Sequence, residues 1–266
     1  MLPLVLIVSL YHLLKGGHDK YKRILRFGII YIVGLLIPIL PVTVRNPAVA
    51  DDAVLISAQG RANFYIGNSR YADSLTVVMP LAGAVFEGGE FDDNIHSQSV
   101  SLAKKAYGRD VRESEVSSYW YRQALSDMVA DPARTALLLA KKALYFWHGQ
   151  EIFNNKSLYY AGEYSALMGL AIWKTDFFNF PSGLLFPLMF IGVVFALRQK
   201  TKFVVPLAYI GIYSIVVIMF FVCARFRQPI VPVAIILASY GIIELYQTIR
   251  KRKRDGYCRC VYSSFR

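Results

Sequence analysis

Long apolar blocks separated by short polar segments occupy both ends of the chain. The chain contains five such blocks. They are Leu2–Leu14, Phe27–Val44, Gly183–Leu197, Phe203–Cys223 and Ile230–Tyr246. Helices that cross a bilayer need about 20 predominantly apolar residues. The pattern therefore predicts an α-helical integral membrane protein with about five spans, of which the short first block represents a truncated one.

The polar segments that alternate with these blocks are strongly basic on one side of the predicted bilayer. Residues 15–26, 198–202 and 250–254 carry five, three and five Lys or Arg against a single Asp. Cytoplasmic loops are enriched in Lys and Arg. With five crossings all three segments lie on the same side, so we predict that they are cytoplasmic and that residues 45–182 are extracytoplasmic.

Composition and charge agree with this topology. The chain is 55% hydrophobic and 18% charged, whereas soluble domains are nearer 25% charged. The net charge of +12 is concentrated at the ends of the apolar blocks, because residues 45–176 contain 13 Lys or Arg and 15 Asp or Glu. A nucleic-acid surface would need a basic patch with interleaved aromatics, and none occurs. We therefore exclude a nucleic-acid partner.

The extracytoplasmic segment is patterned like a folded domain, mostly helical with a few short strands. Val54–Ile56 and Phe64–Ile66 are predicted as strands, because apolar triplets are bounded there by turn residues. Asp110 and Glu113 have capping-box spacing and predict a helix from about Glu113 to Val129.

A second helix is predicted from Pro132 to about Trp147, with Asp131 as its N-cap. Its apolar side is expected to face a partner helix or the bilayer surface, and comprises Leu137, Leu138, Ala140 and Leu144. The predicted organisation is residues 1–44 with two spans, 45–182 outside, 183–249 with three spans, and a basic tail at 250–266.

Metal and nucleophile motifs are absent from the sequence. The four histidines are far apart, and no His-x-x-x-His or Gly-x-Ser-x-Gly pattern occurs. The acidic cluster Glu87–Asp93 could hold a divalent cation, but a solvated glycine-rich loop is the commoner explanation. Cys223, Cys258 and Cys260 are interpreted as unpaired thiols. We predict no metal and no cofactor.

Two segments have candidate chemistry. Arg225 and Arg227 lie on the predicted extracytoplasmic side, where arginines are disfavoured. They could bind a lipid phosphate through charge-assisted hydrogen bonds, or extend to ordinary headgroups, and the sequence favours neither. Residues 146–155 mix aromatic and amide side chains, a composition that suits the membrane interface and also stacking against sugar rings.

Together these motifs resemble bacterial membrane glycosyltransferases of the GT-C class, which are relatives of the protein O-mannosyltransferases and the aminoarabinose lipid A transferases. The resemblance covers residues 25–250 and rests on four stretches. They are Gln59–Asn68 (QGRANFYIGN), Val116–Trp120 with Asp131-Pro132, Lys141–Asn155, where the family commonly has Asn in place of His148, and Arg225–Pro232 (RFRQPIVP).

The resemblance implies transfer of a sugar from a polyprenyl-phosphate carrier to an extracytoplasmic protein, lipid or glycan acceptor, at a bacterial inner membrane. It suggests phosphate- or substrate-binding roles for eight residues, Asn63, Asn68, His148, Glu151, Asn154, Asn155, Arg225 and Arg227. The family's catalytic acids belong to the first exterior loop, which has no counterpart here. We therefore expect the C-terminal part of such an enzyme, inactive alone, and assign no catalytic residue.

A different class of function is also compatible with the sequence. The chain could be a non-catalytic membrane-anchored protein whose extracytoplasmic helices bind a partner. A small transporter is disfavoured, because Glu244 is the only acidic residue inside a predicted span.

Overall fold

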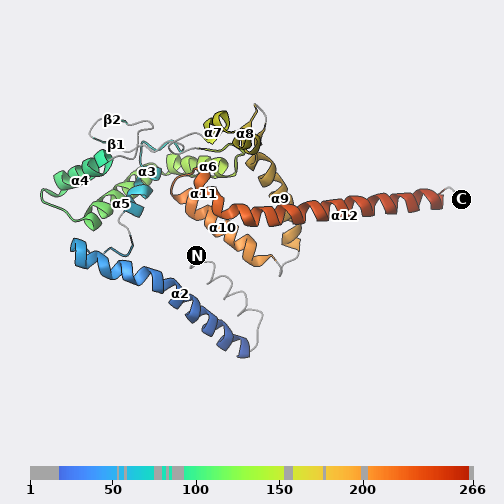
Figure 1. The fold of residues 1–266 in the computed structure, drawn as a ribbon, viewed down its shortest axis with the longest axis horizontal. Helices are drawn as coiled ribbons and strands as arrows, with labels where there is room; N and C mark the ends of the chain where they lie inside the picture. Colours follow the sequence, from blue (N-terminus) through green and yellow to red (C-terminus); the bar gives the residue numbers. More distant parts are fainter. Residues whose placement is uncertain are drawn as a thin grey trace. The chain divides into compact units, whose positions relative to one another are not determined.

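The protein is predominantly helical in a computed structural model (Figure 1). The structure describes residues 18–52, 54–56, 59–74, 80–81, 84–85, 93–152, 158–175, 178–198 and 203–263. The predicted first block, Leu2–Leu14, lies outside these residues.

The elements follow one another along the chain as short and long helices with two small hairpins. The helices are α2 (His18–Ala50), α3 (Gln59–Asn68), α4 (Asp93–Tyr107), α5 (Glu113–Ala130), α6 (Pro132–Trp147), α7 (Leu158–Tyr164), α8 (Ala166–Ala171), α9 (Ser182–Arg198), α10 (Val204–Met219), α11 (Ala224–Arg227), η1 (Gln228–Ile230, a 3₁₀ turn) and α12 (Val231–Ser263). The strands are β1 (Pro80–Leu81), which pairs antiparallel with β2 (Ala84–Val85), and β3 (Trp173–Lys174), which pairs antiparallel with β4 (Asn179–Phe180).

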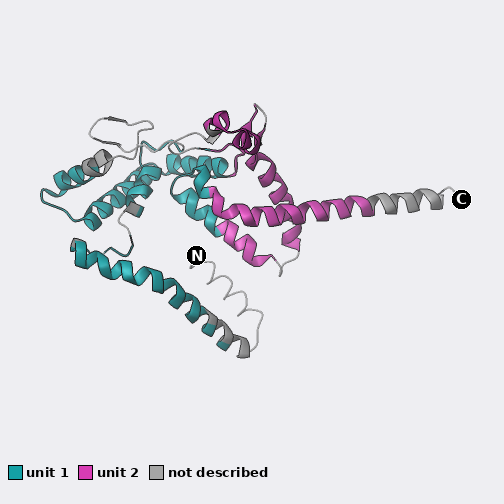
Figure 2. Ribbon diagram, in the orientation of Figure 1, with its two compact units in different colours: residues 1–146, 152–157, 212–226 teal, residues 147–151, 158–211, 227–266 magenta. Residues whose placement is uncertain are grey.

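The chain forms two compact units (Figure 2). Unit 1 comprises residues 1–146, 152–157 and 212–226, and unit 2 comprises 147–151, 158–211 and 227–266. These units divide the chain by packing, and they cut across the boundaries predicted at 44/45 and 182/183, which describe membrane topology and stay predictions.

Two helices are long and apolar enough to cross a membrane, within the described part of the chain. They are Gly28–Val49 of α2 and the segment Ala224–Lys251, which includes most of the apolar part of α12. The apolar helices α9 and α10 are shorter. Helices therefore cover four of the five predicted spans, although α10 ends at Met219, before the predicted limit at Cys223.

The core of unit 1 joins α3, α4 and α5. Phe64, Tyr65 and Ile66 of α3 are buried against Trp120 and neighbouring residues of α5. The prediction of a strand at 64–66 is therefore wrong. A run of three apolar residues has no visible period, so a strand and a helix buried on several sides look alike in sequence.

The predicted strand at Val54–Ile56 is also wrong. These residues form bends after α2, and side chains of α2 satisfy their carbonyls instead of a neighbouring strand. Asn46 Nδ2 donates to the Val54 carbonyl at 2.7 Å, and Thr43 Oγ1 donates to the Leu55 carbonyl at 2.6 Å.

The two helices predicted within residues 45–182 are confirmed as α5 and α6. Asp131 is the N-cap of α6, since its carboxylate accepts a hydrogen bond from Arg134 N at 2.9 Å. The cap predicted for α5 is wrong, because Asp110 pairs with Lys104 instead. The start of α5 is stabilised by Glu115, which accepts from Arg112 N at 2.9 Å.

The face of α6 that packs inward differs from the predicted apolar side. Leu138, Lys142 and Phe146 are buried, whereas Leu137 and Leu144 are 58% and 72% exposed. The helix therefore places Lys142 in the interior of unit 1 and two leucines on the surface.

In unit 2, α9 and α12 pack closely enough to bring their backbones together. A Cβ on Gly192 of α9 would lie 1.8 Å from the Leu237 carbonyl oxygen of α12, and one on Gly241 would lie 2.6 Å from Gly192 N. Small residues allow such approach between apolar helices. This contact positions the start of α9 and the short helices that precede α12, where the polar cluster around Arg227 lies.

Candidate functional site

Arg227 is at the centre of a buried polar cluster in unit 2. Its side chain is 2% exposed. Nη1 donates to the His148 carbonyl at 2.7 Å, and Nη2 donates to the Gln150 carbonyl and to Glu151 Oε2, the latter at 3.2 Å. The planar guanidinium group therefore binds one short segment, residues 148–151, through several of its donors.

Glu151 connects this arginine to the beginning of α9. Its other carboxylate oxygen accepts a hydrogen bond from the Ser182 hydroxyl, and Glu151 N donates to the Tyr159 hydroxyl at 2.9 Å. The carboxylate is buried, and burial of an ionised group is tolerated when it is paired and hydrogen-bonded, as it is here.

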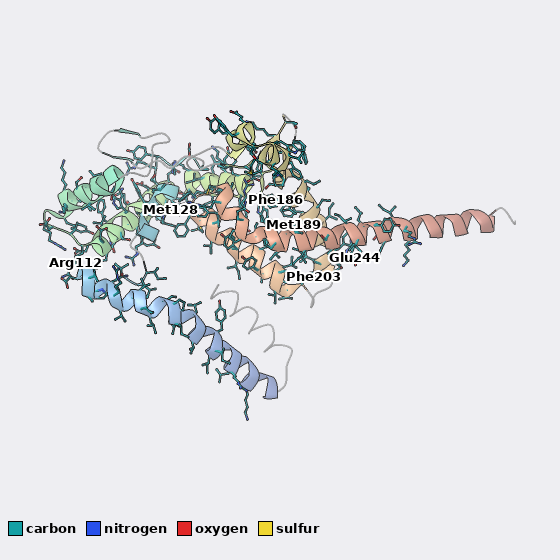
Figure 3. All side chains as sticks on the ribbon, viewed as in Figure 1. Arg112, Met128, Phe186, Met189, Phe203 and Glu244 are labelled. Carbon is teal, nitrogen blue, oxygen red and sulfur yellow. The ribbon has the colours of Figure 1, made fainter. Side chains whose placement is uncertain are left out.

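A buried aromatic ring lies against the arginine of this ion pair. Phe186, labelled on α9 in Figure 3, is 1% exposed, and the Arg227 guanidinium lies 5.8 Å from the centroid of its ring. Trp147 packs edge-on against both Phe186 and Phe190, with centroids 5.4 and 5.2 Å apart. The side chains of Arg227 and Glu151 are only 2% and 6% exposed, so their attraction is screened less than that of a pair at the surface.

His148 and Gln150 are exposed on the same segment, whose carbonyls Arg227 binds. Arg225 is exposed on α11, where its guanidinium lies 5.4 Å from the Phe226 ring centroid. The predicted pair of phosphate-binding arginines therefore divides into a buried one and an exposed one. Arg227 holds its own chain, and phosphate binding stays a prediction for Arg225.

A second polar cluster lies in the interior of unit 1, around Lys142. Its side chain is fully buried, and Nζ donates to Asn68 Oδ1 at 2.9 Å and to the Phe220 carbonyl at 2.6 Å. Asn68 Nδ2 in turn donates to the carbonyls of Phe64 and Met219, at 2.9 and 2.8 Å. The cluster therefore satisfies backbone carbonyls at the C-terminal end of α10.

The environment of Lys142 disfavours its charge. Burial, with repulsion from Arg134 as a smaller cause, lowers the pKa of the Lys142 amine to about 7. Its hydrogen-bond partners are an amide and a carbonyl, neither of which carries a negative charge. The amine therefore titrates near neutral pH while it holds α3, α6 and the end of α10 together.

A glycine makes this arrangement sterically possible. A Cβ on Gly67 would lie 2.0 Å from the Phe220 carbonyl oxygen, the same atom that accepts from Lys142.

Two arginines hold the chain that follows α3. Arg134 donates to the carbonyls of Ser69 and Ala72, at 3.1 and 2.8 Å. Arg70 forms an ion pair with Asp127 of α5 at 2.9 Å.

The structure thus brings together some of the predicted site residues. Arg227, Glu151 and the His148 backbone meet in unit 2, and Asn68 belongs to the unit 1 cluster. Asn63 lies half-buried on α3. Asn154 and Asn155 lie outside the described residues, as does the acidic cluster Glu87–Asp93 except for Asp93, which begins α4.

Sequence reasoning did not select Lys142 or Ser182. Lys142 had a usable signal, because it continues the spacing of Leu138 and Phe146 on one helix face. For Ser182 the sequence contains no signal other than its position just before the apolar block Gly183–Leu197.

Among the described residues, no group of three His, Cys, Asp or Glu side chains is placed to hold a metal ion. Comparison of the sequence with family models, with curated proteins and with solved structures gives no match. Function must therefore be argued from the residues themselves.

Proposed function

We propose that this chain is part of a membrane glycosyltransferase that takes a sugar from a polyprenyl-phosphate carrier, and that Arg225 binds the phosphate of that carrier. The observation that carries the proposal is the contrast on α11 between an exposed Arg225 and a buried Arg227. The resemblance of the motifs to GT-C enzymes supports a polyprenyl phosphate as the ligand.

The local setting of Arg225 suits a lipid-linked anion. It lies at the start of the apolar segment Ala224–Lys251, so its charge and the apolar side chains that follow could meet the phosphate and the polyprenyl chain of one molecule. A guanidinium group binds phosphate with two parallel hydrogen bonds, which an ammonium group does not reproduce. None of the described residues is assigned to the chemical step.

The decisive experiment measures retention of radiolabelled polyprenyl phosphate by the full chain purified in detergent. We expect Arg225→Gln to weaken binding about tenfold, which corresponds to loss of about 1.4 kcal/mol of a charge-assisted contact. Arg225→Lys should restore binding only in part. Arg122→Gln, at another exposed arginine on α5, is the matched control and should bind as the wild type does.

Equal retention by the wild type and Arg225→Gln would contradict the carrier role. The second candidate, a membrane-anchored protein that binds a partner through its extracytoplasmic helices, would then be preferred. It is favoured by the use of Asn68, Glu151 and Arg227 in contacts within their own units.

A further inference from the structure

The hairpin of α7 and α8 in unit 2 exposes an unusually apolar surface. Its two helices are joined at Ser165, whose hydroxyl accepts from Met168 N at the start of α8. Four side chains are more than half exposed, Tyr160 at 53%, Tyr164 at 74%, Leu167 at 79% and Leu170 at 77%. Leucines exposed to this extent on neighbouring turns are unusual for a surface in contact with water.

The packing of the hairpin explains why these side chains point outward. The two helices meet at glycines, since a Cβ on Gly162 would lie 3.1 Å from the Cα of Gly169. Such a close contact between backbones leaves no room between the two helices for large side chains at this point. The hairpin therefore uses its glycines for the helix contact. Tyr159 is half-buried and its hydroxyl accepts from Glu151 N, whereas the four side chains named above stay outside.

The hairpin is connected directly to the start of an apolar helix. β3 follows α8 and pairs with β4, so that Trp173 lies opposite Phe180, with the two rings stacked at 5.6 Å. Ser182, the first residue of α9, comes two residues after Phe180. The structure thus places the end of the hairpin beside the beginning of α9 (Figure 1).

The charges near α9 indicate which of its ends is extracytoplasmic. Its C-terminal residue is Arg198, and Lys200 and Lys202 follow, as expected for a cytoplasmic end. If α9 crosses the bilayer, its first turn lies at the opposite interface. Tyr and Trp side chains are enriched at that level, where a ring and a polar edge are both accommodated.

We propose that the α7–α8 hairpin is an interfacial membrane anchor whose Tyr164, Leu167 and Leu170 enter the boundary between lipid headgroups and acyl chains. The hairpin from residue 158 to 174 contains a single acid, Glu163, and a single base, Lys174, so it has no net charge and suits neutral as well as anionic lipids. This inference rests on membrane crossing by α9 and is independent of glycosyl transfer.

The test uses the full chain with Cys223, Cys258 and Cys260 replaced by Ala, reconstituted into phosphatidylcholine vesicles. Leu167→Cys carries a bimane fluorophore, and Ser126→Cys, at an exposed position of α5, is the matched control. We expect lipids brominated at carbons 6 and 7 to quench the probe at 167 at least twofold. Bromines at carbons 11 and 12 should quench it less, and the probe at 126 should be unaffected.

Three outcomes would overturn the proposal. The probe at 167 could be quenched by aqueous iodide as strongly as the probe at 126, which would place it in water. Deeper bromines could quench it more than shallow ones, which would place it inside the bilayer. Alternatively, bromolipids could leave it unquenched while its emission shifts to the blue with increasing protein-to-lipid ratio, which would mean that a second copy covers the hairpin. Size-exclusion elution at the wild-type volume checks that each labelled variant is folded.

Discussion

Both compact units bury a cationic side chain, but they give it different partners. In unit 2, Arg227 faces the carboxylate of Glu151 together with two backbone carbonyls. In unit 1, Lys142 faces a neutral amide and a neutral carbonyl. Both side chains connect segments that are distant in sequence. The two clusters therefore stabilise the fold in the same way, but only the arginine has a negatively charged partner.

The difference shows how the choice of cation follows from the partner. An arginine keeps its charge at any physiological pH, so it needs a buried carboxylate and enough acceptors for its donors. A lysine can release its proton, and a neutral amine still donates to carbonyls. Unit 2 therefore buries a cation that keeps its charge, whereas unit 1 buries one whose charge depends on pH.

The largest effect is expected from breaking the ion pair in unit 2. Arg227→Met leaves the Glu151 carboxylate buried without its partner, which should lower the free energy of unfolding by about 3–5 kcal/mol. Glu151→Leu together with Arg227→Met should recover part of that loss, because neither charge is then buried alone. Unfolding of the full chain in mixed micelles, followed by circular dichroism during titration with a denaturing detergent, measures both.

Lys142→Met is the matched comparison for this experiment. It leaves two neutral acceptors without a donor, which costs about 1–3 kcal/mol. If Lys142→Met destabilises the protein more than Arg227→Met does, the electrostatic contrast between the two units is wrong.

A smaller effect is expected from displacing the acceptor of Lys142. Gly67→Ala places a methyl group 2.0 Å from the Phe220 carbonyl oxygen, so the end of α10 must move away from α3. Overpacking of this kind typically costs about 1–3 kcal/mol. The same unfolding titration should show it.

Gly60 provides the control for this substitution within the same helix. A Cβ at Gly60 meets nothing within 4 Å, so Gly60→Ala should be neutral or slightly stabilising through helix propensity. Equal effects at positions 60 and 67 would mean that the close approach to Phe220 does not hold the helices together.

Sequence patterns predicted the elements that depend on local signals. The apolar blocks predicted the apolar helices. The Asp131-Pro132 pair predicted the start of α6, because an N-cap and the fixed φ of proline act within a few residues. The strand at 64–66 was wrong because burial on several sides removes the periodicity that distinguishes a helix from a strand.

The polar clusters were harder to predict because they depend on tertiary contacts. Lys142 is 74 residues from Asn68, and Arg227 is 76 from Glu151. Lys, Arg, Glu and Asn side chains are usually exposed, so the sequence gives little reason to place these four residues in the interior. The motif that suggested ligand binding by Arg227 instead supplies a contact inside unit 2. The membrane topology and the role of Arg225 stay predictions.

The last prediction concerns the pH dependence of the unit 1 cluster, whose effect on the free energy of unfolding is small for each pH unit. The pKa of Lys142 is about 7 in the folded protein and close to the ordinary value of 10.5 when the chain is unfolded. Between these values the unfolded chain holds a proton that the folded chain has released. The free energy of unfolding therefore rises with pH in this window, by at most about 1.4 kcal/mol per pH unit, and the contribution of Lys142 is constant outside it.

The measurement compares the wild type with Lys142→Met from pH 7 to pH 9.5, because other groups that titrate in this range are common to both proteins. The wild type should gain stability relative to the variant as the pH rises. Arg227→Lys made in the Lys142→Met protein provides a second contrast, since Glu151 favours the charged form of a lysine placed beside it. The curve of this double variant relative to Lys142→Met should not show the rise. Parallel curves for the wild type and Lys142→Met would mean that Lys142 keeps its proton throughout, and the two clusters would then differ in partners but not in response to pH.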